Sequence, residues 1–600
     1  MPQGSILSPV LFCVKINNII KSVKDGSDCS LFVDDFGLYA VGKIYPALQR
    51  RLQLCVSEIN KWADVNGFKF SSEKTECIHF HNFRRFFPDP EIFLGLNKIP
   101  AVKEAKFLGI TFDQKLNFKS HLRKLKYSCQ KSLDIIRVVA HTDWGADKHT
   151  LLHLYRSLVR SKLDYGSVVY GSARKSYLKT LDPIHHQGLR LCLGAFRTTP
   201  VHSLYAEANE PSLENRRSKL ALNYYLGMAS NKDNPAYDCV MNPLFYEKYL
   251  EHVNCIPSFG VRMLQLAEEA DIDTGVIEDT SKFTEEAPWL LEVPRVMFDL
   301  TSYRKHETSP SQYIQVFLEM TADLDTHGTI YTDGSKTDEG VACAAVFPQQ
   351  GKNCHVSLPN ECSVYTAELY GLVLGLQIVE SSAKGRYLIG SDSLSALEAI
   401  HSKNLSNPLL ISFFARYNEL NTAGYEVLLA WIPGHVGICG NEMADRLARE
   451  AVKNRPINMK VPYSDLKRKV SSYVFSTWEE DWLVEGLSGP AENKLHVIRP
   501  DLKVSIPSAT KNRKEETVLC RLHVGHTYFT HSFLLKGEDP PMCIGCNAQW
   551  SVRHILLDCW DLYDVRRRHY TADNIKQLFR DVPPDKIFSF LREVHLFYCL

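Results

Sequence analysis

Four acidic residues occupy positions where a phosphodiester-cleaving site would need them. Asp333 and Asp392 each end a predicted strand, in residues 329–333 and 387–391. Glu368 lies in the first turns of a predicted helix. Asp445 lies on a later helix, one turn after Asn441, so these two share a face. Strand ends meet at one edge of a sheet and a helix adds its own side chain, so we expect the four carboxylates to converge.

Converging carboxylates suit metal-assisted hydrolysis. Cleavage of a phosphodiester needs a nucleophilic water and a stabilised leaving oxygen, and two divalent ions about 3.5–4 Å apart supply both. Such ions require hard, anionic oxygen ligands. Without metal, the same cluster is unfavourable because like charges repel. Taken singly, each acid is more simply a surface residue, so only the joint pattern indicates chemistry.

The elements around these acids alternate between strand and helix. Period-2 and period-3.6 patterns predict strands over 329–333, 340–347, 387–391 and 425–432, and helices over 364–379, from Ser393 and over 441–453. This alternation predicts an α/β domain with a mixed sheet and flanking helices.

The same block resembles the ribonuclease H type-1 family in order and spacing. The matching segments are Tyr331–Ser335, Thr366–Leu369, Gly390–Ser393, Trp431–Gly437 and Gly440–Asp445.

The resemblance implies a role for each matched residue. Asp333, Glu368, Asp392 and Asp445 are then ligands of two Mg²⁺ or Mn²⁺ ions, and His435 assists proton transfer or product release from a mobile loop. The implied reaction is endonucleolytic cleavage of RNA in an RNA–DNA hybrid.

The first 120 residues resemble the reverse transcriptase of non-LTR (LINE, Jockey-like) retrotransposons. The matching segments are Pro2–Pro9, Phe32–Asp35, Gly67–Thr75 and Phe107–Asp113. Asp34 and Asp35 then correspond to metal-binding carboxylates of a strand–turn–strand hairpin, and Lys74 lies near the nucleotide triphosphate. Gln3 and Gly4 belong to the segment that positions template and nucleotide.

This polymerase site is predicted to be incomplete. In that family another metal-binding Asp and the fingers region precede the segment that begins here at Pro2. We therefore expect a truncated palm with uncovered core-facing surface and no polymerase activity by this chain alone. RNA-directed DNA polymerase activity remains an alternative if the missing segments are supplied separately.

Cysteines near the end of the sequence have metal-ligand spacing. Cys543 and Cys546 are followed by His554 and Cys559, in the pattern Cys-x2-Cys-x7-His-x4-Cys. Two ligands from a glycine-containing knuckle and two from a helix start would close a tetrahedral zinc site. Ordinary buried thiols are the alternative.

The whole chain is predicted to be an α/β multidomain protein. We expect a partial palm (1–115), a helical thumb or connection (116–230), a connector (231–324), a ribonuclease H domain (325–455) and a helical Cys/His tail (456–600). Neither a signal peptide nor an apolar run of about 18 residues is found, so we expect an intracellular protein of nucleus or cytoplasm without a membrane partner.

Nucleic acid is the expected partner. The formal net charge is only +1, so the distribution of charge decides, and basic residues crowd 115–137. The leading hypothesis is a hybrid-cleaving ribonuclease that binds RNA–DNA hybrid, RNA and DNA. The rival hypothesis is a noncatalytic nucleic-acid-binding remnant.

Overall fold

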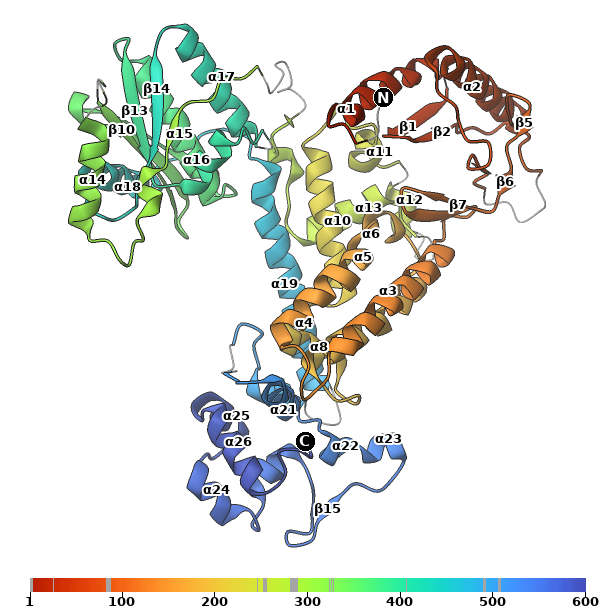
Figure 1. Cartoon of the computed structure of the whole chain (residues 1–600), viewed down its shortest axis with the longest axis vertical. Coiled ribbons are helices and arrows are strands. Elements are labelled where there is room, and N and C mark those ends of the chain that lie inside the picture. Colours follow the sequence, from red (N-terminus) through yellow and green to blue (C-terminus); the bar gives the residue numbers. More distant parts are fainter. Residues whose placement is uncertain are drawn as a thin grey trace. The chain divides into compact units, whose positions relative to one another are not determined.

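The computed structural model describes residues 4–24, 26–81, 88–244, 246–251, 256–280, 290–322, 324, 326, 328–405, 407–488, 493–504 and 509–600 (Figure 1). The chain divides into two compact units. We call Glu214–Glu480 the sheet unit, and Met1–Leu213 with Asp481–Leu600 the discontinuous unit.

A six-stranded mixed sheet forms the centre of the sheet unit. Its strand order is β12-β11-β10-β13-β14-β9. Strands β12, β11 and β10 pair antiparallel, and β10, β13, β14 and β9 pair in parallel, so β10 belongs to both sets. The strands are β9 (Val296–Met297), β10 (Thr329–Lys336), β11 (Val341–Phe347), β12 (Lys352–Leu358), β13 (Arg386–Ser391) and β14 (Glu426–Trp431). The predicted mixed sheet is confirmed, with β9 and β12 as strands that the sequence patterns did not indicate.

Helices cover both faces of this sheet. Ile330 of β10 packs into a core with α15 (Val364–Glu380), α16 (Leu394–His401) and α17 (Pro408–Thr422). The next residue, Tyr331, packs into a second core with α14 (Pro310–Ala322) and α18 (Cys439–Ala451). Successive strand residues point to opposite faces, so the domain has three layers. Every residue of β11 is buried, as expected for a strand covered on both faces.

Two glycines allow backbone to approach backbone beside the carboxylates. A Cβ on Gly334 would lie 2.6 Å from the backbone nitrogen of Glu368, so β10 and the start of α15 touch there. A Cβ on Gly440 would overlap the ring of Tyr331, so α18 also lies directly on β10. These two contacts bring a strand and two helices to one place.

The remaining helices of the sheet unit precede and follow the sheet. They are α10 (Leu213–Ala229), α11 (Tyr237–Met241), α12 (Tyr246–Glu251), α13 (Phe259–Glu269) and α19 (Tyr463–Ser488), with α10 and α19 extending past its boundaries. Leu222, Tyr225 and Leu226 of α10 belong to the same core as α15. None of the helices in the described residues is both long and apolar enough to cross a membrane.

The first part of the discontinuous unit holds small hairpins and helices. Its elements up to the basic helix are α1 (Leu7–Ile16), η1 (Asn17–Ser22), β1 (Asp28–Phe32), β2 (Asp35–Tyr39), α2 (Tyr45–Asn66), β3 (Cys77–Ile78), β4 (Phe93–Leu94), β5 (Asn97–Lys98), β6 (Ala101–Val102), β7 (Glu104–Phe107), β8 (Ile110–Asp113) and α3 (Lys119–Val139). Helix α1 exposes Leu7, Val10 and Val14, an apolar face with 65%, 59% and 66% of each residue accessible. The structure thus leaves one face of α1 apolar and exposed.

Helices and one short hairpin make up the rest of the described part of this unit. The segment up to 213 continues with α4 (Lys148–Tyr155), α5 (Ser161–Asp164), α6 (Ser167–Tyr170), α7 (Lys175–Leu178), α8 (Asp182–Leu193) and α9 (Val201–Ala208). The tail holds α20 (Lys494–Ile498), α21 (Arg513–Val524), α22 (Tyr528–His531), α23 (Phe533–Lys536), β15 (Met542–Cys543), β16 (Ala548–Gln549), α24 (Tyr563–His569), α25 (Ile575–Asp581) and α26 (Pro584–Glu593). The tail has its own core, with Ile555, Phe588 and Leu591 fully buried.

Candidate functional site

Three of the four predicted carboxylates lie together in the sheet unit. Asp333 comes from β10, Glu368 from α15 and Asp392 from the residue after β13. One oxygen from each lies within 4.8 Å of the others. Three elements far apart in sequence therefore converge on one cluster, which we call the carboxylate cluster.

Local structure explains how each acid reaches the cluster. Asp333 does not end its strand as predicted: β10 continues to Lys336, and Asp333 pairs with Ala344. The following Gly334 lies within the strand because its missing side chain makes room for α15, and its N–H donates to the Glu368 carboxylate. Asp392 follows the strand end as predicted, and its carboxylate accepts a hydrogen bond from Asn441 of α18.

Burial makes this cluster electrostatically unfavourable without a cation. Desolvation, with Asp392 and Asp445 nearby, raises the pKa of Asp333 to about 8. Burial beside Asp333 also raises the pKa of Glu368 well above its usual range, and burial raises that of Asp392. One buried carboxylate oxygen of Glu368 has no hydrogen-bond partner in the structure. Hard anionic oxygens held close together and incompletely bonded fit a divalent cation.

The fourth carboxylate, Asp445, lies in a neighbouring group with His435 and Glu442. Ligand atoms of these three residues lie within 4.8 Å of one another. The Asp445 carboxylate is 3.8 Å from Nδ1 of His435 and accepts from Nε of Arg449 at 2.8 Å. Asp445 is still close enough to raise the pKa of Asp333. Sequence reasoning did not single out Glu442, although it is one helical turn before Asp445 on the same helix.

His435 is an exposed side chain on a left-handed backbone position. Its φ is 58°, and 62% of its side chain is accessible. A Cβ on the preceding Gly434 would overlap the Asp392 carboxylate, so this backbone lies directly against the carboxylate cluster. The imidazole is thus free to meet a ligand at the edge of the cluster.

The predicted polymerase residues are exposed where the structure describes them. Asp34 lies in the turn between β1 and β2 and Asp35 begins β2, and both are exposed. Among the described residues, neither belongs to a group of three or more candidate metal ligands. Lys74 is exposed in a turn, and Gly4 is exposed with a φ of 92°. Gln3 lies outside the described residues.

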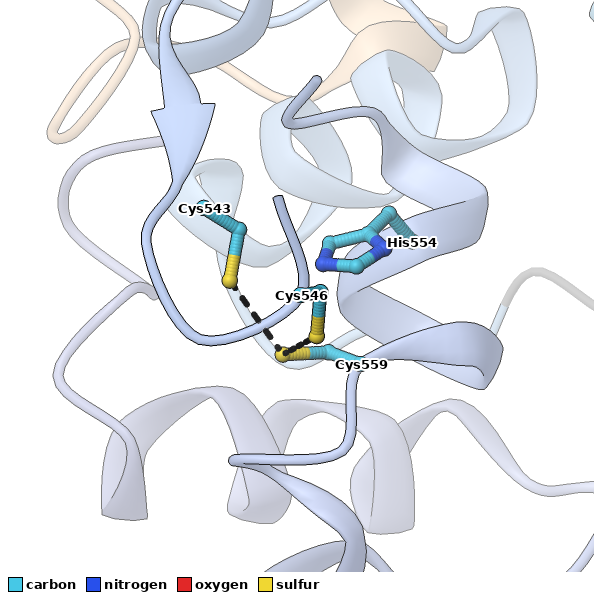
Figure 2. A group of neighbouring side chains, drawn as sticks. All are labelled: Cys543, Cys546, His554 and Cys559. Atoms are coloured by element: carbon cyan, nitrogen blue, oxygen red, sulfur yellow. Dashed lines mark hydrogen bonds between the residues drawn. The ribbon is translucent and has the colours of Figure 1, made fainter. Parts of the chain in front are cut away.

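Cysteine and histidine side chains of the tail meet as predicted (Figure 2). The Cys559 sulfur is 3.9 Å from that of Cys543 and 3.8 Å from that of Cys546. A disulfide needs about 2.05 Å, whereas sulfurs at about 2.3 Å from one tetrahedral zinc lie about 3.8 Å apart. Nε2 of His554 is buried without a hydrogen-bond partner, and Figure 2 shows its ring beside the three thiols.

The surroundings of these thiols are also organised. Cys543 ends β15 of a short hairpin, and the backbone N–H of Trp560 donates to the Cys546 sulfur at 3.4 Å and lowers the pKa of that thiol. The predicted helix start holds for His554, which begins the π-helical turn η8 (His554–Asp558), whereas Cys559 follows the end of that turn. The buried Arg566 donates to the Cys559 carbonyl at 2.8 Å and holds this end in place.

Sequence comparison defines the class of the two matched segments. Residues 325–453 match the family model described as RNase H, and residues 1–112 match that of the reverse transcriptase (RNA-dependent DNA polymerase) family. The chain therefore combines an RNase H segment with a reverse transcriptase segment.

Curated relatives come from insect retrotransposons. The chain is 26% identical over 236 residues to the RNA-directed DNA polymerase from the mobile element jockey of Drosophila melanogaster, covering 37% of this chain and 25% of that protein. It is 24% identical over 212 residues to the Pol polyprotein of element R1 of Nasonia vitripennis, covering 34% and 62%. The predicted resemblance to non-LTR retrotransposon polyproteins is confirmed, and the matches span less than two thirds of these relatives.

Solved structures include two similar ribonucleases. RNase H1 from Halobacterium salinarum is 21% identical and covers 21% of this chain and 98% of its own, with a TM-score of 0.18. LC11-RNase H1 in complex with an RNA/DNA hybrid is 18% identical and covers 21% and 95%, with a TM-score of 0.18.

The raised pKa of Asp333 predicts a pH-dependent stability of the metal-free protein. Its pKa of about 8 in the folded protein exceeds the value of about 4 in the unfolded chain. The stability that Asp333 contributes is therefore fully present below about pH 4 and is lost as the pH rises through 8. In chelator at pH 8.5, Asp333→Asn should therefore stabilise the sheet unit by about 2 kcal/mol. The gain should shrink toward pH 5. Native-state hydrogen exchange of β10 amides measures the difference.

The matched control is Asp338→Asn, which removes the same charge from an exposed position three residues after Ser335. It should leave the opening free energy of β10 unchanged at both pH values. A loss of stability in Asp333→Asn at pH 8.5 in chelator would contradict the electrostatic account.

Proposed function

We propose that the sheet unit cleaves the RNA strand of RNA–DNA hybrids endonucleolytically at the carboxylate cluster. The observation that carries the proposal is the convergence of Asp333, Glu368 and Asp392 within 4.8 Å in a buried setting. This is a costly arrangement without cations, and it lies in the segment that matches the RNase H family. Hybrid is the substrate that this family match implies.

Asp333, Glu368 and Asp392 would hold Mg²⁺ or Mn²⁺, with Asp445 as the fourth ligand once it leaves Arg449. When bound, such ions activate a water and stabilise the leaving oxygen of the phosphodiester. Asn441 orients the Asp392 carboxylate by its hydrogen bond. Exposed His435 would transfer a proton at the leaving oxygen or assist product release. Sequence-independent contacts to the backbone and to the 2′-hydroxyl would select the hybrid.

Cleavage is tested with the full 600-residue chain. Purified protein with Mg²⁺ or Mn²⁺ should cut the labelled RNA strand of a hybrid internally and leave single-stranded RNA and duplex DNA intact. Asp333→Asn and Asp392→Asn should lose at least about 100-fold in kcat because each removes a charged ligand. Asp338→Asn, the exposed control, should keep full activity.

Two results would reject the proposal. Hybrid that is bound but uncut with either metal would favour the rival reading, a noncatalytic nucleic-acid-binding remnant. Cutting that survives Asp333→Asn would assign the activity to another site.

The reverse transcriptase segment is proposed to be inactive in this polypeptide by itself. Asp34 and Asp35 are exposed and belong to no larger ligand group among the described residues. Two metals in nucleotidyl transfer need more carboxylates than this hairpin offers. Primer extension on an RNA template should therefore give no product above that of Asp34→Asn/Asp35→Asn protein. Extension that the double variant abolishes would establish polymerase activity.

A structural zinc ion is proposed for Cys543, Cys546, His554 and Cys559. The sulfur spacing fits tetrahedral zinc, and the unpartnered His554 nitrogen completes a three-sulfur, one-nitrogen donor set. All four positions belong to residues, so no position is open for substrate, as in structural rather than catalytic zinc sites. The ion would tie the β15–β16 hairpin to the end of η8.

Zinc content of the purified full chain decides this assignment. Mass spectrometry of the metals should give one zinc per chain, and Cys559→Ser should lose it because the remaining ligands are too few. The control Cys599→Ser alters an exposed thiol of the same tail and should keep the metal. Substoichiometric zinc in wild-type protein purified without chelator would leave buried thiols as the correct reading.

A further inference from the structure

The segment before the RNase H match contributes to the sheet unit. Residues 325–453 match the family, yet β9 at 296–297 pairs in parallel with β14 as the sixth strand. The backbone N–H of Leu429 in β14 also donates to the Arg295 carbonyl at 2.9 Å. This segment was predicted to be part of a connector, and the structure places it on the sheet at the strand that leads to His435.

The loop that carries His435 directly follows β14. We define the His435 loop as residues 432–438. Its backbone includes two left-handed positions, His435 and Gly437, with φ values of 58° and 86°. Such a backbone has few regular hydrogen bonds of its own, so its position depends on what packs against it.

A lysine from the preceding segment bonds to this loop. Nζ of Lys305 donates to the carbonyl of Gly434 at 2.8 Å. The other side of Gly434 lies against the Asp392 carboxylate, with no room for a Cβ. The backbone next to His435 is thus held between an ammonium group and a member of the carboxylate cluster. A hydrogen bond to a charged donor is stronger than a neutral one.

Apolar side chains of the same segment support the rest of the loop. Val436 and Ile438 are 4% and 5% exposed and pack in one core with Leu300, Tyr313 and Phe317. A Cβ on Gly437 would lie 3.5 Å from Ile314 of α14, which is ordinary van der Waals contact. The loop therefore buries Val436 and Ile438 on residues 300–317 while His435, the residue before Val436, stays exposed.

We propose that residues 299–322 form a clamp that sets the position of the His435 loop, with Lys305 as its positioning residue. The effect of the clamp on kinetics rests on the proposed hybrid cleavage. Its effect on the position of the loop does not. Lys305 acts through the Gly434 carbonyl and so determines where the His435 imidazole meets the substrate. Residues outside the family match would then be required for full activity of the domain.

Hydrogen exchange of the full chain tests the clamp without reference to activity. Lys305 is exposed, so Lys305→Ala should fold normally. The amide of Gly437, which donates to the Glu442 carboxylate, and that of Ile432, which donates to the Ser391 carbonyl, should exchange about tenfold faster in this variant because a charged hydrogen bond to the loop is lost. Lys305→Arg should restore protection. The control Arg304→Ala removes a neighbouring exposed cation that pairs only with Glu307 in the described ion pairs, and should change nothing. Unchanged exchange in Lys305→Ala would overturn the proposal.

Kinetics on hybrid then separate positioning from direct substrate binding. A positioning role predicts that Lys305→Ala lowers kcat about three- to tenfold at unchanged KM, and that it has no further effect in a His435→Ala background. A raised KM that persists in the His435→Ala background would mean that Lys305 contacts a phosphate itself, and would overturn the positioning role. If wild-type protein cuts no hybrid, the proposed function fails while the exchange result still decides the clamp.

Discussion

Repulsion among buried carboxylates is the constraint around which the sheet unit is organised. Asp333, Glu368 and Asp392 are brought together from a strand, a helix and a strand end, and burial raises the pKa of each. The surrounding fold must supply the free energy that holds them there, because like charges in a poorly solvated site oppose folding. Continuous burial of β11 and the close backbone contacts at Gly334 and Gly440 hold the three carboxylates in place. The unit thus stores an unfavourable interaction that a bound divalent cation would relieve.

The two proposed metal sites differ in chemistry and in purpose. The carboxylate cluster offers hard oxygens and has an exposed imidazole at its edge, so a substrate can reach bound ions. The tail offers three sulfurs and one nitrogen, with backbone N–H support at Cys546 and a buried Arg566 beside Cys559. Soft donors that fill all four positions favour zinc and exclude substrate. The carboxylate cluster is therefore suited to reaction, and the tail site is suited to holding its surroundings together. A bound ion would add a cross-link where β15 and β16 contribute only two residues each to their hairpin.

Sequence reasoning succeeded where a residue's position follows from its own element. Period-2 and period-3.6 patterns located β10, α15, β13, β14 and α18 to within a few residues, and spacing alone located the four zinc candidates. It failed where tertiary contacts override a local signal. The strand of Asp333 was predicted to end at that residue, but the missing side chain of Gly334 lets α15 approach a continuing strand. Asp445 was expected among the other carboxylates, but it lies in the neighbouring group with His435 and pairs with Arg449 one turn along α18.

The contact of Lys305 with the His435 loop could not be predicted from the sequence. Its partner Gly434 is 129 residues away, and the bond joins one side chain to one backbone carbonyl, so no periodicity or motif encodes it. The sheet order, in which β9 lies beside β14, and the shared apolar core bring the two segments together. Because β14 leads into the His435 loop, any element added beside β14 is well placed to hold that loop. Extension of the sheet at this edge and control of His435 are therefore consequences of the same strand pairing.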